Sequence, residues 1–173
     1  GKFESFGDYN NNKLKSFLEA FGFSYDFKSS TNLYKSGYFD ETIKTILQYY
    51  EQILSVVLPT LREERKKSYS PFLPICPKTK KVLQIKIEKY NIDNNSVVYK
   101  NDETGKFVEV SVLKGGCKLQ WKVDWAMRWI ALGVDYEMCG KDLTDSVNLG
   151  KSICRILKKT APINLIYEMF LDD

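Results

Sequence analysis

The sequence contains no histidine, and its four cysteines include no Cys-x-x-Cys pair. Without histidine this stretch of chain has no Ser-His-Asp or Cys-His catalytic group and lacks the commonest metal ligand. The cysteine spacing supports neither a zinc site nor the disulfide framework of a small secreted protein. No apolar run approaches the ~20 residues that a membrane-spanning helix needs. Any chemistry must therefore come from carboxylates, lysines, aromatic rings and backbone groups.

What is present is typical of a packed globular protein. Hydrophobic residues make up 43% of the chain and aromatic residues 14%, which argues against disorder. The net charge of +4 permits a nucleic-acid partner without requiring one. Unpaired, reduced cysteines favour a cytoplasmic protein. The chain starts at Gly1 with no signal-like pattern and no methionine, so we expect a processed chain or an internal fragment.

The first part of the chain has mainly helical patterns. Residues 10–21 start with asparagines that are suited to capping and carry apolar residues at helical spacing, and Gly22 predicts the end of that helix. The alternating stretch 23–27 predicts a short strand. Asp40 is a candidate cap for a second helix that Pro59 kinks or ends, and residues 61–67 predict a further polar helical turn.

The pattern changes after residue 70. Three prolines within 71–77 exclude a helix there. The runs "VLQIKIEKY", "NSVVYK" and "KFVEVSVL" are separated by the turn-forming stretches "NIDNN" and "NDETG", so residues 71–120 predict a small antiparallel meander. A helical period follows and ends at Gly133, then the strand "VDYEM" and the helix "SVNLGKSICRILKK". A strand and helix behind a β insertion predict an α/β fold.

The turn Gly140-Lys141-Asp142 follows the predicted strand directly. Ligands bind outside the carboxyl ends of parallel strands, where glycine lets the backbone come close to them. Asp142 could there accept hydrogen bonds from the vicinal hydroxyls of a ribose. The alternative is an ordinary glycine turn in which Asp142, Asp145 or Ser146 caps the next helix.

All three tryptophans recur at every fourth residue from Trp121 to Trp129, which places them near one helical face. Core packing is the expected role of Trp129. Trp121 stands where the helix begins, beside Asp124, so its ring could stack on a ligand cation or base. Asp124 either caps the helix or holds an ammonium group. The basic runs 62–67 and 78–81 are solvated faces or, if they share one side, phosphate contacts.

Several segments resemble the class I lysyl-tRNA synthetase family in its bacterial form. They are "YSPFLPICPKTKKVLQ", "LQWKVDWAMRWIALGVDYEMCGKDLTDSV" and "APINLIYEMFLDD", together with the opening "GKFESFGDYNNNKLKSFLEAFGFSYDF" and "YKSGYFDETI". They cover nearly the whole chain in order. The long tryptophan-to-GKDL string is specific, whereas a lone Gly-Lys-Asp would not be.

The resemblance implies a fragment of a protein about three times longer. The expected fold is α/β: a partial Rossmann-type parallel sheet with helices that carries a small antiparallel β insertion. Residues 1–70 would be a helical and α/β part of the connective region, 71–120 the small antiparallel β insertion, and 121–173 the second part of the Rossmann catalytic domain. The family's HIGH-type and KMSKS-type motifs are absent from the sequence, so we expect no catalytic motif residue here. The KMSKS-type motif would be expected shortly after Asp173.

The resemblance also implies a function and site residues. The family activates lysine with ATP to lysyl-adenylate and transfers it to tRNA(Lys), so the implied partners are lysine, ATP (with Mg²⁺) and tRNA. Gly140 and Asp142 match the turn that holds the adenosine ribose. Trp121, Asp124 and Tyr167 are implied for lysine binding, Asp124 more loosely.

Two departures from the family pattern bear on these roles. Many relatives read GKDH, and here Leu143 replaces the histidine, which marks the bacterial subtype. Some relatives carry zinc knuckles in the insertion, of which Cys76 and Cys117 would be the only remnants, so no zinc is expected.

Other readings of the sequence predict different behaviour. A stand-alone RNA-binding paralogue that kept the fold but lost ligase activity would bind RNA in a salt-dependent way. The interpretation as a nucleotide-binding regulatory domain is supported only by the Gly-x-Asp turn. The length of the gene separates the fragment from both, and the isolated fragment is expected to be inactive as a ligase.

Overall fold

The computed structural model describes residue 3 and residues 5–168, and the chain divides into two compact units, 1–32 and 33–173. In the first unit, helix α1 (Phe6–Ala20) ends before Gly22, which has a φ of 71°. The expected asparagine cap is wrong: Ser5 caps α1 and accepts from the backbone N–H of Asp8 at 3.1 Å. The strand predicted at 23–27 is also wrong. The Tyr25 hydroxyl donates to Glu19 at 3.2 Å, so this segment folds back on its own helix and does not pair with another strand.

Five short helices follow along the chain. They are α2 (Ser30–Ser36), α3 (Asp40–Gln48), α4 (Tyr50–Val57), η1 (Leu58–Thr60) and α5 (Glu63–Lys66). The second helix predicted from sequence is interrupted at Tyr49, and Pro59 lies in the 3₁₀ turn η1 that ends it. Ile43, Ile46 and Ile53 are fully buried on one side of α3 and α4, which confirms the predicted apolar face.

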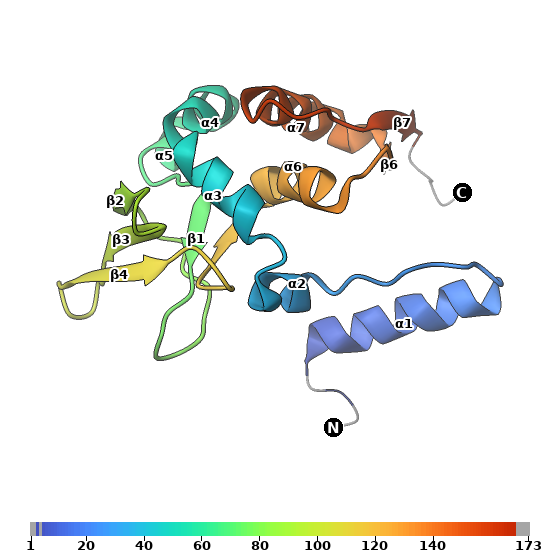
Figure 1. Cartoon of the computed structure of the whole chain (residues 1–173), viewed down its shortest axis with the longest axis horizontal. Coiled ribbons are helices and arrows are strands. Elements are labelled where there is room, and N and C mark those ends of the chain that lie inside the picture. The colour runs from blue at the N-terminus through green and yellow to red at the C-terminus, as the bar shows by residue number, and fades with distance from the viewer. Residues whose placement is uncertain (1–2, 4, 169–173) are drawn as a thin grey trace. The chain divides into compact units, whose positions relative to one another are not determined.

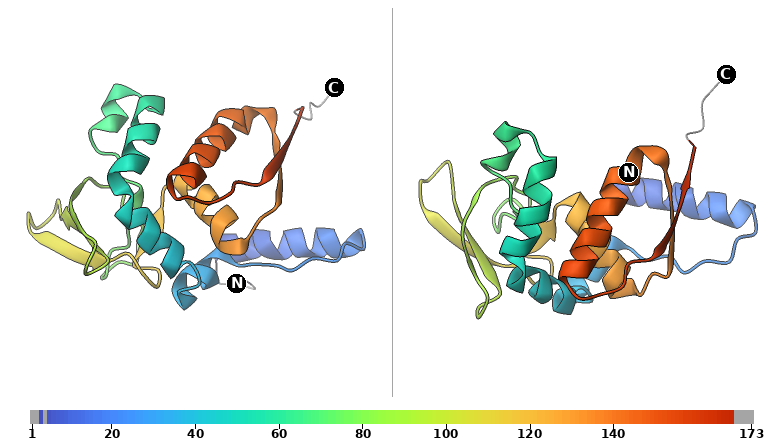
Figure 2. Two further views of the ribbon diagram at one scale, coloured as in Figure 1. Left: turned by 45° about the horizontal axis from the view of Figure 1, so that its top comes forward. Right: turned by 90° about the horizontal axis from the view of Figure 1, so that it is seen from above.

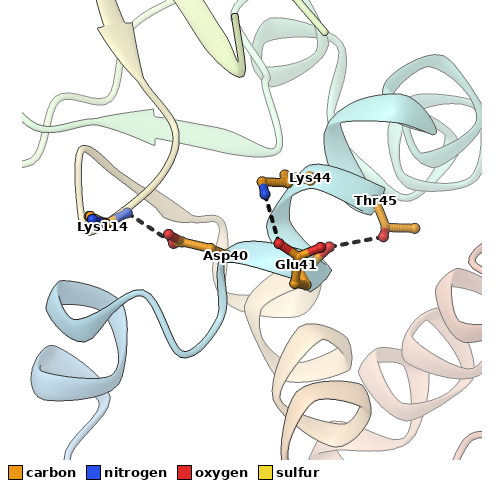
Figure 3. Close-up of polar contacts among 5 residues, drawn as sticks. All are labelled: Asp40, Glu41, Lys44, Thr45 and Lys114. Atoms are coloured by element: carbon orange, nitrogen blue, oxygen red, sulfur yellow. Dashed lines mark hydrogen bonds and ion pairs between the residues drawn. The ribbon is translucent and has the colours of Figure 1, made fainter. Parts of the chain in front are cut away.

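Asp40 does not cap α3, contrary to the sequence-based expectation. The N-cap position is Phe39, and no side chain bonds the helix end. Figure 3 shows the Asp40 carboxylate turned toward the loop that holds Lys114, whose backbone N–H donates to it at 2.9 Å. Glu41, the next residue, pairs with Lys44 at 2.7 Å. A long-range backbone donor has therefore replaced the local one that a cap would use, and it ties α3 to the chain 74 residues later.

The predicted antiparallel strands are present as two sheets. One pairs β1 (Phe72–Pro74) with β5 (Cys117–Leu119), and the other has the order β2 (Ile87–Asn91), β3 (Ser96–Lys100), β4 (Phe107–Ser111). The turns lie where "NIDNN" and "NDETG" predicted them, and the Asn101 side chain accepts from the backbone N–H of Glu103 and of Thr104. On this meander Val97 and Tyr99 are buried, and Tyr90 stacks on Tyr50 of α4 with ring centroids 4.4 Å apart.

The last part of the second unit contains one parallel strand pair. Helix α6 (Trp121–Leu132) ends at Gly133 in the left-handed conformation and is followed by β6 (Tyr136–Gly140), η2 (Lys141–Leu143), α7 (Thr144–Ile156) and β7 (Ile163–Tyr167). Strands β6 and β7 pair in parallel, with Gly140 opposite Tyr167. Figures 1 and 2 show α6 and α7 on the same side of this pair. The expected mixed α/β composition is confirmed.

Helices α6 and α7 pack closely because α7 has a glycine at their contact. A Cβ atom at Gly150 would lie 2.5 Å from the ring of Trp129, which is 2% exposed. The core role expected for Trp129 is therefore confirmed. Among the described residues, no helix is both long and apolar enough to cross a membrane.

Candidate functional site

The carboxyl end of β6 brings three of the predicted site residues together. A Cβ atom at Gly140 would lie 2.6 Å from Oδ1 of Asp142 and 3.8 Å from the ring of Tyr167 on the adjacent strand. Asp142 is exposed and Tyr167 is 41% exposed. Lys141, between the glycine and the aspartate, forms an ion pair with Glu168. The turn is thus an open corner with an exposed carboxylate and a phenol ring, and any side chain at position 140 would disturb it.

The capping alternative for this turn is wrong. The residue at the N-cap of α7 is Leu143, and neither η2 nor α7 has a side-chain cap hydrogen bond. Thr144 uses its hydroxyl to donate to the carbonyl oxygen of Lys141 at 2.7 Å, so it does not protect the helix end either. Without a capping bond, the carboxylate of Asp142 is not committed to the helix N-terminus, whose free N–H groups favour an anion nearby.

The other predicted residues lie on the first turn of α6. Trp121 is 51% exposed. Asp124 is mostly covered and already has two partners, Tyr34 and Arg128. The Tyr34 hydroxyl donates to its Oδ1 at 2.5 Å, and Arg128 pairs with its Oδ2 at 2.6 Å. No cap bond forms at the start of α6, so the alternative role of Asp124 as a helix cap is wrong.

Tyr34 joins this cluster to the preceding strand. Its hydroxyl also accepts from the backbone N–H of Leu119 at 3.2 Å, and the residue is 3% exposed. Burial, and next the charge of Asp124, raises the pKa of Tyr34 well above its ordinary value. The phenol therefore stays protonated and acts as a donor, which fixes the start of α6 against β5.

Glu137 is a site residue that sequence reasoning missed. Its Oε2 accepts from the indole N–H of Trp125 at 3.1 Å and from that of Trp129 at 2.8 Å. The sequence signalled it only weakly: a carboxylate inside an otherwise apolar strand, next to a helix with tryptophans at every fourth position. A buried indole N–H needs an acceptor, so the repeated tryptophans themselves called for one.

Two polar groups near these residues are buried without a hydrogen-bond partner in the part of the chain that the structure describes. One is Nε of Arg128, and the other is the side-chain amide of Asn164, which lies opposite Glu137 in the strand pair. Such groups are rare in folded proteins. Both belong to residues that contact or neighbour the candidate site.

Metal and thiol chemistry have little support among residues 3 and 5–168. No group of three or more His, Cys, Asp or Glu side chains there is placed to hold a metal ion. All four cysteines are free thiols. Burial raises the pKa of Cys117 to about 12, whereas hydrogen bonds from Thr79 lower the pKa of Cys76.

Comparison with known proteins identifies the family of this chain. Residues 1–173 match the family described as tRNA synthetases class I (K). The lysine–tRNA ligases of Rickettsia africae (strain ESF-5), Rickettsia felis (strain ATCC VR-1525 / URRWXCal2) and Rickettsia bellii (strain RML369-C) are 56%, 57% and 55% identical to it. Each match covers the whole of this chain and 33% of the relative, so the chain spans about a third of their length. This chain therefore belongs to the class I (K) family of tRNA synthetases.

Proposed function

We propose that this chain is an internal part of a lysine–tRNA ligase. In the first step a carboxylate oxygen of lysine attacks the α-phosphorus of ATP and pyrophosphate leaves. In the second, a terminal ribose hydroxyl of tRNA(Lys) attacks the lysyl carbonyl carbon and AMP leaves. The observation that carries this proposal is the 55–57% identity to lysine–tRNA ligases along the entire chain. We propose that the protein acts in the cytoplasm.

The finer fold that we propose is a Rossmann-type sheet to which β6, α7 and β7 contribute one unit. The parallel pairing of β6 with β7 across α7 supports it. On the face away from the helices, Tyr136, Met138 and Leu165 are between 48% and 56% exposed. Parallel sheets normally have both faces covered, so we propose that the rest of the full-length protein covers this one. Residues 1–70 and 71–120 would then be the connective region and its β insertion.

The corner at Gly140 is proposed to hold the adenosine ribose of ATP and of lysyl-adenylate. Glycine leaves the backbone bare, and the exposed carboxylate of Asp142 lies next to it. The two vicinal hydroxyls of a ribose are donors that a single carboxylate can accept together. Mg²⁺ would enter as part of the ATP substrate, and we propose no zinc.

Trp121, Asp124 and Tyr167 are proposed to bind lysine. The exposed indole of Trp121 offers a face for the ammonium group. Each oxygen of Asp124 has one partner, Tyr34 or Arg128, and each carboxylate oxygen accepts up to two bonds. The lysine ammonium can therefore bind Asp124 as an added donor without breaking the existing pair. Tyr167 lies beside Gly140, where it would flank the junction of lysine and adenosine.

The proposed contribution of these residues to rate is positioning, since none of them is a nucleophile or a general base for the attacking carboxylate. Aligning the lysine carboxylate with the α-phosphorus lowers the entropic part of the barrier. The motifs that handle the triphosphate are not in this sequence, so we expect the isolated 173-residue chain to form no lysyl-adenylate.

Lysine-dependent exchange of pyrophosphate into ATP by the full-length protein tests the function. Asp142→Ala should raise the KM for ATP roughly tenfold, the loss expected for a charge-assisted hydrogen bond. Asp145→Ala, an exposed aspartate in the first turn of α7, is the matched control and should leave the KM unchanged. Absence of lysine-dependent exchange in the unaltered full-length protein would reject the proposed function.

A further inference from the structure

The three tryptophans of α6 form one continuous row of rings. Trp121 stacks on Trp125 with centroids 5.3 Å apart and planes at 24°, and Trp125 contacts Trp129 at 5.1 Å and 50°. The row begins at the half-exposed ring of Trp121 and ends at the buried ring of Trp129. The exposed ring of Trp121 is therefore linked to the buried ring of Trp129 through Trp125.

Both inner rings bond to a single carboxylate oxygen. The indole N–H groups of Trp125 and Trp129 converge on Oε2 of Glu137 at 3.1 and 2.8 Å. An indole N–H only donates and a carboxylate only accepts, so neither partner can reverse the bond. Bonds to an ionised acceptor are shorter and stronger than neutral ones. The two rings are thus held at defined angles by one atom.

Glu137 connects two elements that carry different parts of the proposed site. Glu137 lies on β6, three residues before Gly140, whereas the rings that it holds lie on α6 with Trp121. The proposed ribose corner and the proposed lysine-binding face are thus parts of different elements. The two indole bonds connect those elements directly.

We propose that Glu137 is a positioning residue that fixes where the ring of Trp121 stands relative to the Gly140 corner. The inference rests on the proposed function in one respect only, namely that Trp121 contacts lysine. Glu137 itself touches no substrate, and it acts through Trp125 and Trp129. The start of α6 is held separately, by the bond from Tyr34 of α2 to Asp124, so we assign to Glu137 the orientation of the rings.

Tryptophan fluorescence of the 173-residue chain tests the first half of the proposal, because its three tryptophans are the three rings of the row. Glu137→Ala removes the shared acceptor and should shift the emission to longer wavelength and increase quenching by acrylamide. Glu137→Gln keeps an acceptor oxygen at the same place and should resemble the unaltered chain. Glu88→Ala on β2, whose carboxylate pairs with Lys86, is the control and should change nothing. An unchanged emission in Glu137→Ala would overturn the proposal.

Kinetics of the full-length protein test the second half. Glu137→Ala should raise the KM for lysine roughly tenfold, with a smaller change in kcat and none in the KM for ATP, and Glu137→Gln should restore the KM. Glu137→Asp keeps the charge but is one methylene shorter, so it reaches one indole at most and should raise the KM by an intermediate factor. This variant also serves if the alanine variant does not fold.

The relative effects on kcat and on the KM for lysine distinguish a positioning role of Glu137 from a merely structural one. A variant that only lowered the folded fraction would reduce kcat and leave the KM for lysine unchanged, and that result would overturn the proposal. If the unaltered full-length protein showed no lysine-dependent exchange, the proposed function would fail, and an altered fluorescence in Glu137→Ala would still establish the control of the rings by Glu137.

Discussion

The antiparallel sheet β2–β3–β4 and the parallel pair β6–β7 differ in how far their apolar side chains are buried. The antiparallel sheet buries Val97 and Tyr99, and Tyr90 stacks on Tyr50 of α4. Apart from Phe107, its exposed residues are polar or charged, namely Glu88, Lys89, Lys100, Glu109 and Ser111. The parallel pair has α6 and α7 on one side, but on the other it leaves Met138 and Leu165 about half exposed.

The difference separates a sheet whose apolar residues are mostly buried from a strand pair whose outer apolar face is about half exposed. An antiparallel sheet is stable with one face in water, whereas a parallel sheet is normally covered on both faces. On β2–β4 the apolar residues Val97, Tyr99 and Val110 are buried, and Phe107 at the start of β4 is the exception at 67% exposure. The apolar side chains on the outer face of β6–β7 have no cover from the described residues of the second unit.

The largest effect is expected where the antiparallel sheet meets its helix. Tyr50→Ala removes a buried ring that stacks on Tyr90 and Phe72 and leaves Ser70 without the hydroxyl that donates to it. The free energy of unfolding should fall by about 3–5 kcal/mol, measured by urea titration of the 173-residue chain. Tyr38→Ala, which removes a ring that is 55% exposed, is the control. Equal losses in the two variants would contradict the comparison.

The next effect concerns the helices that cover the parallel pair. Gly150→Ala places a methyl group 2.5 Å from the ring of Trp129, so α6 and α7 must move apart. The expected loss of unfolding free energy is about 1–3 kcal/mol. Gly7→Ala in α1, where the added atom has no neighbour closer than 3.8 Å, should not destabilise the chain. A stable Gly150→Ala variant would mean that the helix pair is looser than the structure shows.

The cysteines should differ in thiol reactivity, a smaller effect that is confined to individual side chains. Cys76 has a lowered pKa, whereas burial raises the pKa of Cys117 to about 12 and that of Cys154 to about 11. Iodoacetamide at pH 8 should therefore alkylate Cys76 first, as read by mass spectrometry of tryptic peptides. Rapid labelling of Cys117 at that pH would show that β5 opens.

The same shifts predict a loss of stability in alkaline solution. A buried thiol has a higher pKa in the folded chain than in the unfolded one, where it is about 9. The unfolded state therefore loses its proton first, and the stability that Cys117 contributes is complete below pH 9 and is lost as the pH rises through about 12. Tyr34 and Tyr69, whose pKa values burial also raises, act in the same direction. The urea midpoint should fall steadily above pH 9.

The smallest effect is expected on the bare face of the parallel pair. Leu165→Lys should change the unfolding free energy of the 173-residue chain by no more than about 0.5 kcal/mol, since an exposed position tolerates charge. The same substitution in the full-length protein should be strongly destabilising if other polypeptide covers this face. Equal, small effects in both proteins would mean that the face stays open to solvent.

Local sequence signals predicted the elements well where the residues themselves determine the backbone. Gly22 and Gly133 end helices in the left-handed conformation, and the turns around Asn95 and Asn101 lie where the polar stretches placed them. The predictions that failed depended on distant partners. Asp40 was expected to cap its own helix but accepts from Lys114, because a backbone donor far along the chain lies within reach only after folding.

The candidate site divides in the same way. Gly140 and Asp142 could be placed together from a strand that ends in a glycine turn, whereas Tyr167 came only from the family resemblance, since no strand was predicted at 163–167. Tyr34 could not be predicted as a partner of Asp124, because it precedes Asp124 by 90 residues, although the other partner, Arg128, is only four residues away. Glu137 was missed because a glutamate in a strand pattern is ordinarily a solvent-facing residue, and its role depends on the angle at which α6 crosses β6.

The pairing of β1 with β5 has a consequence for how this protein could change over evolutionary time. Phe72 lies opposite Leu119 and Pro74 opposite Cys117, so the chain leaves the helical part and returns to it at neighbouring points. The segment between β1 and β5 is therefore an insertion whose two ends lie next to each other. It can lengthen, shorten or be exchanged without altering the distance that the helices on either side must span.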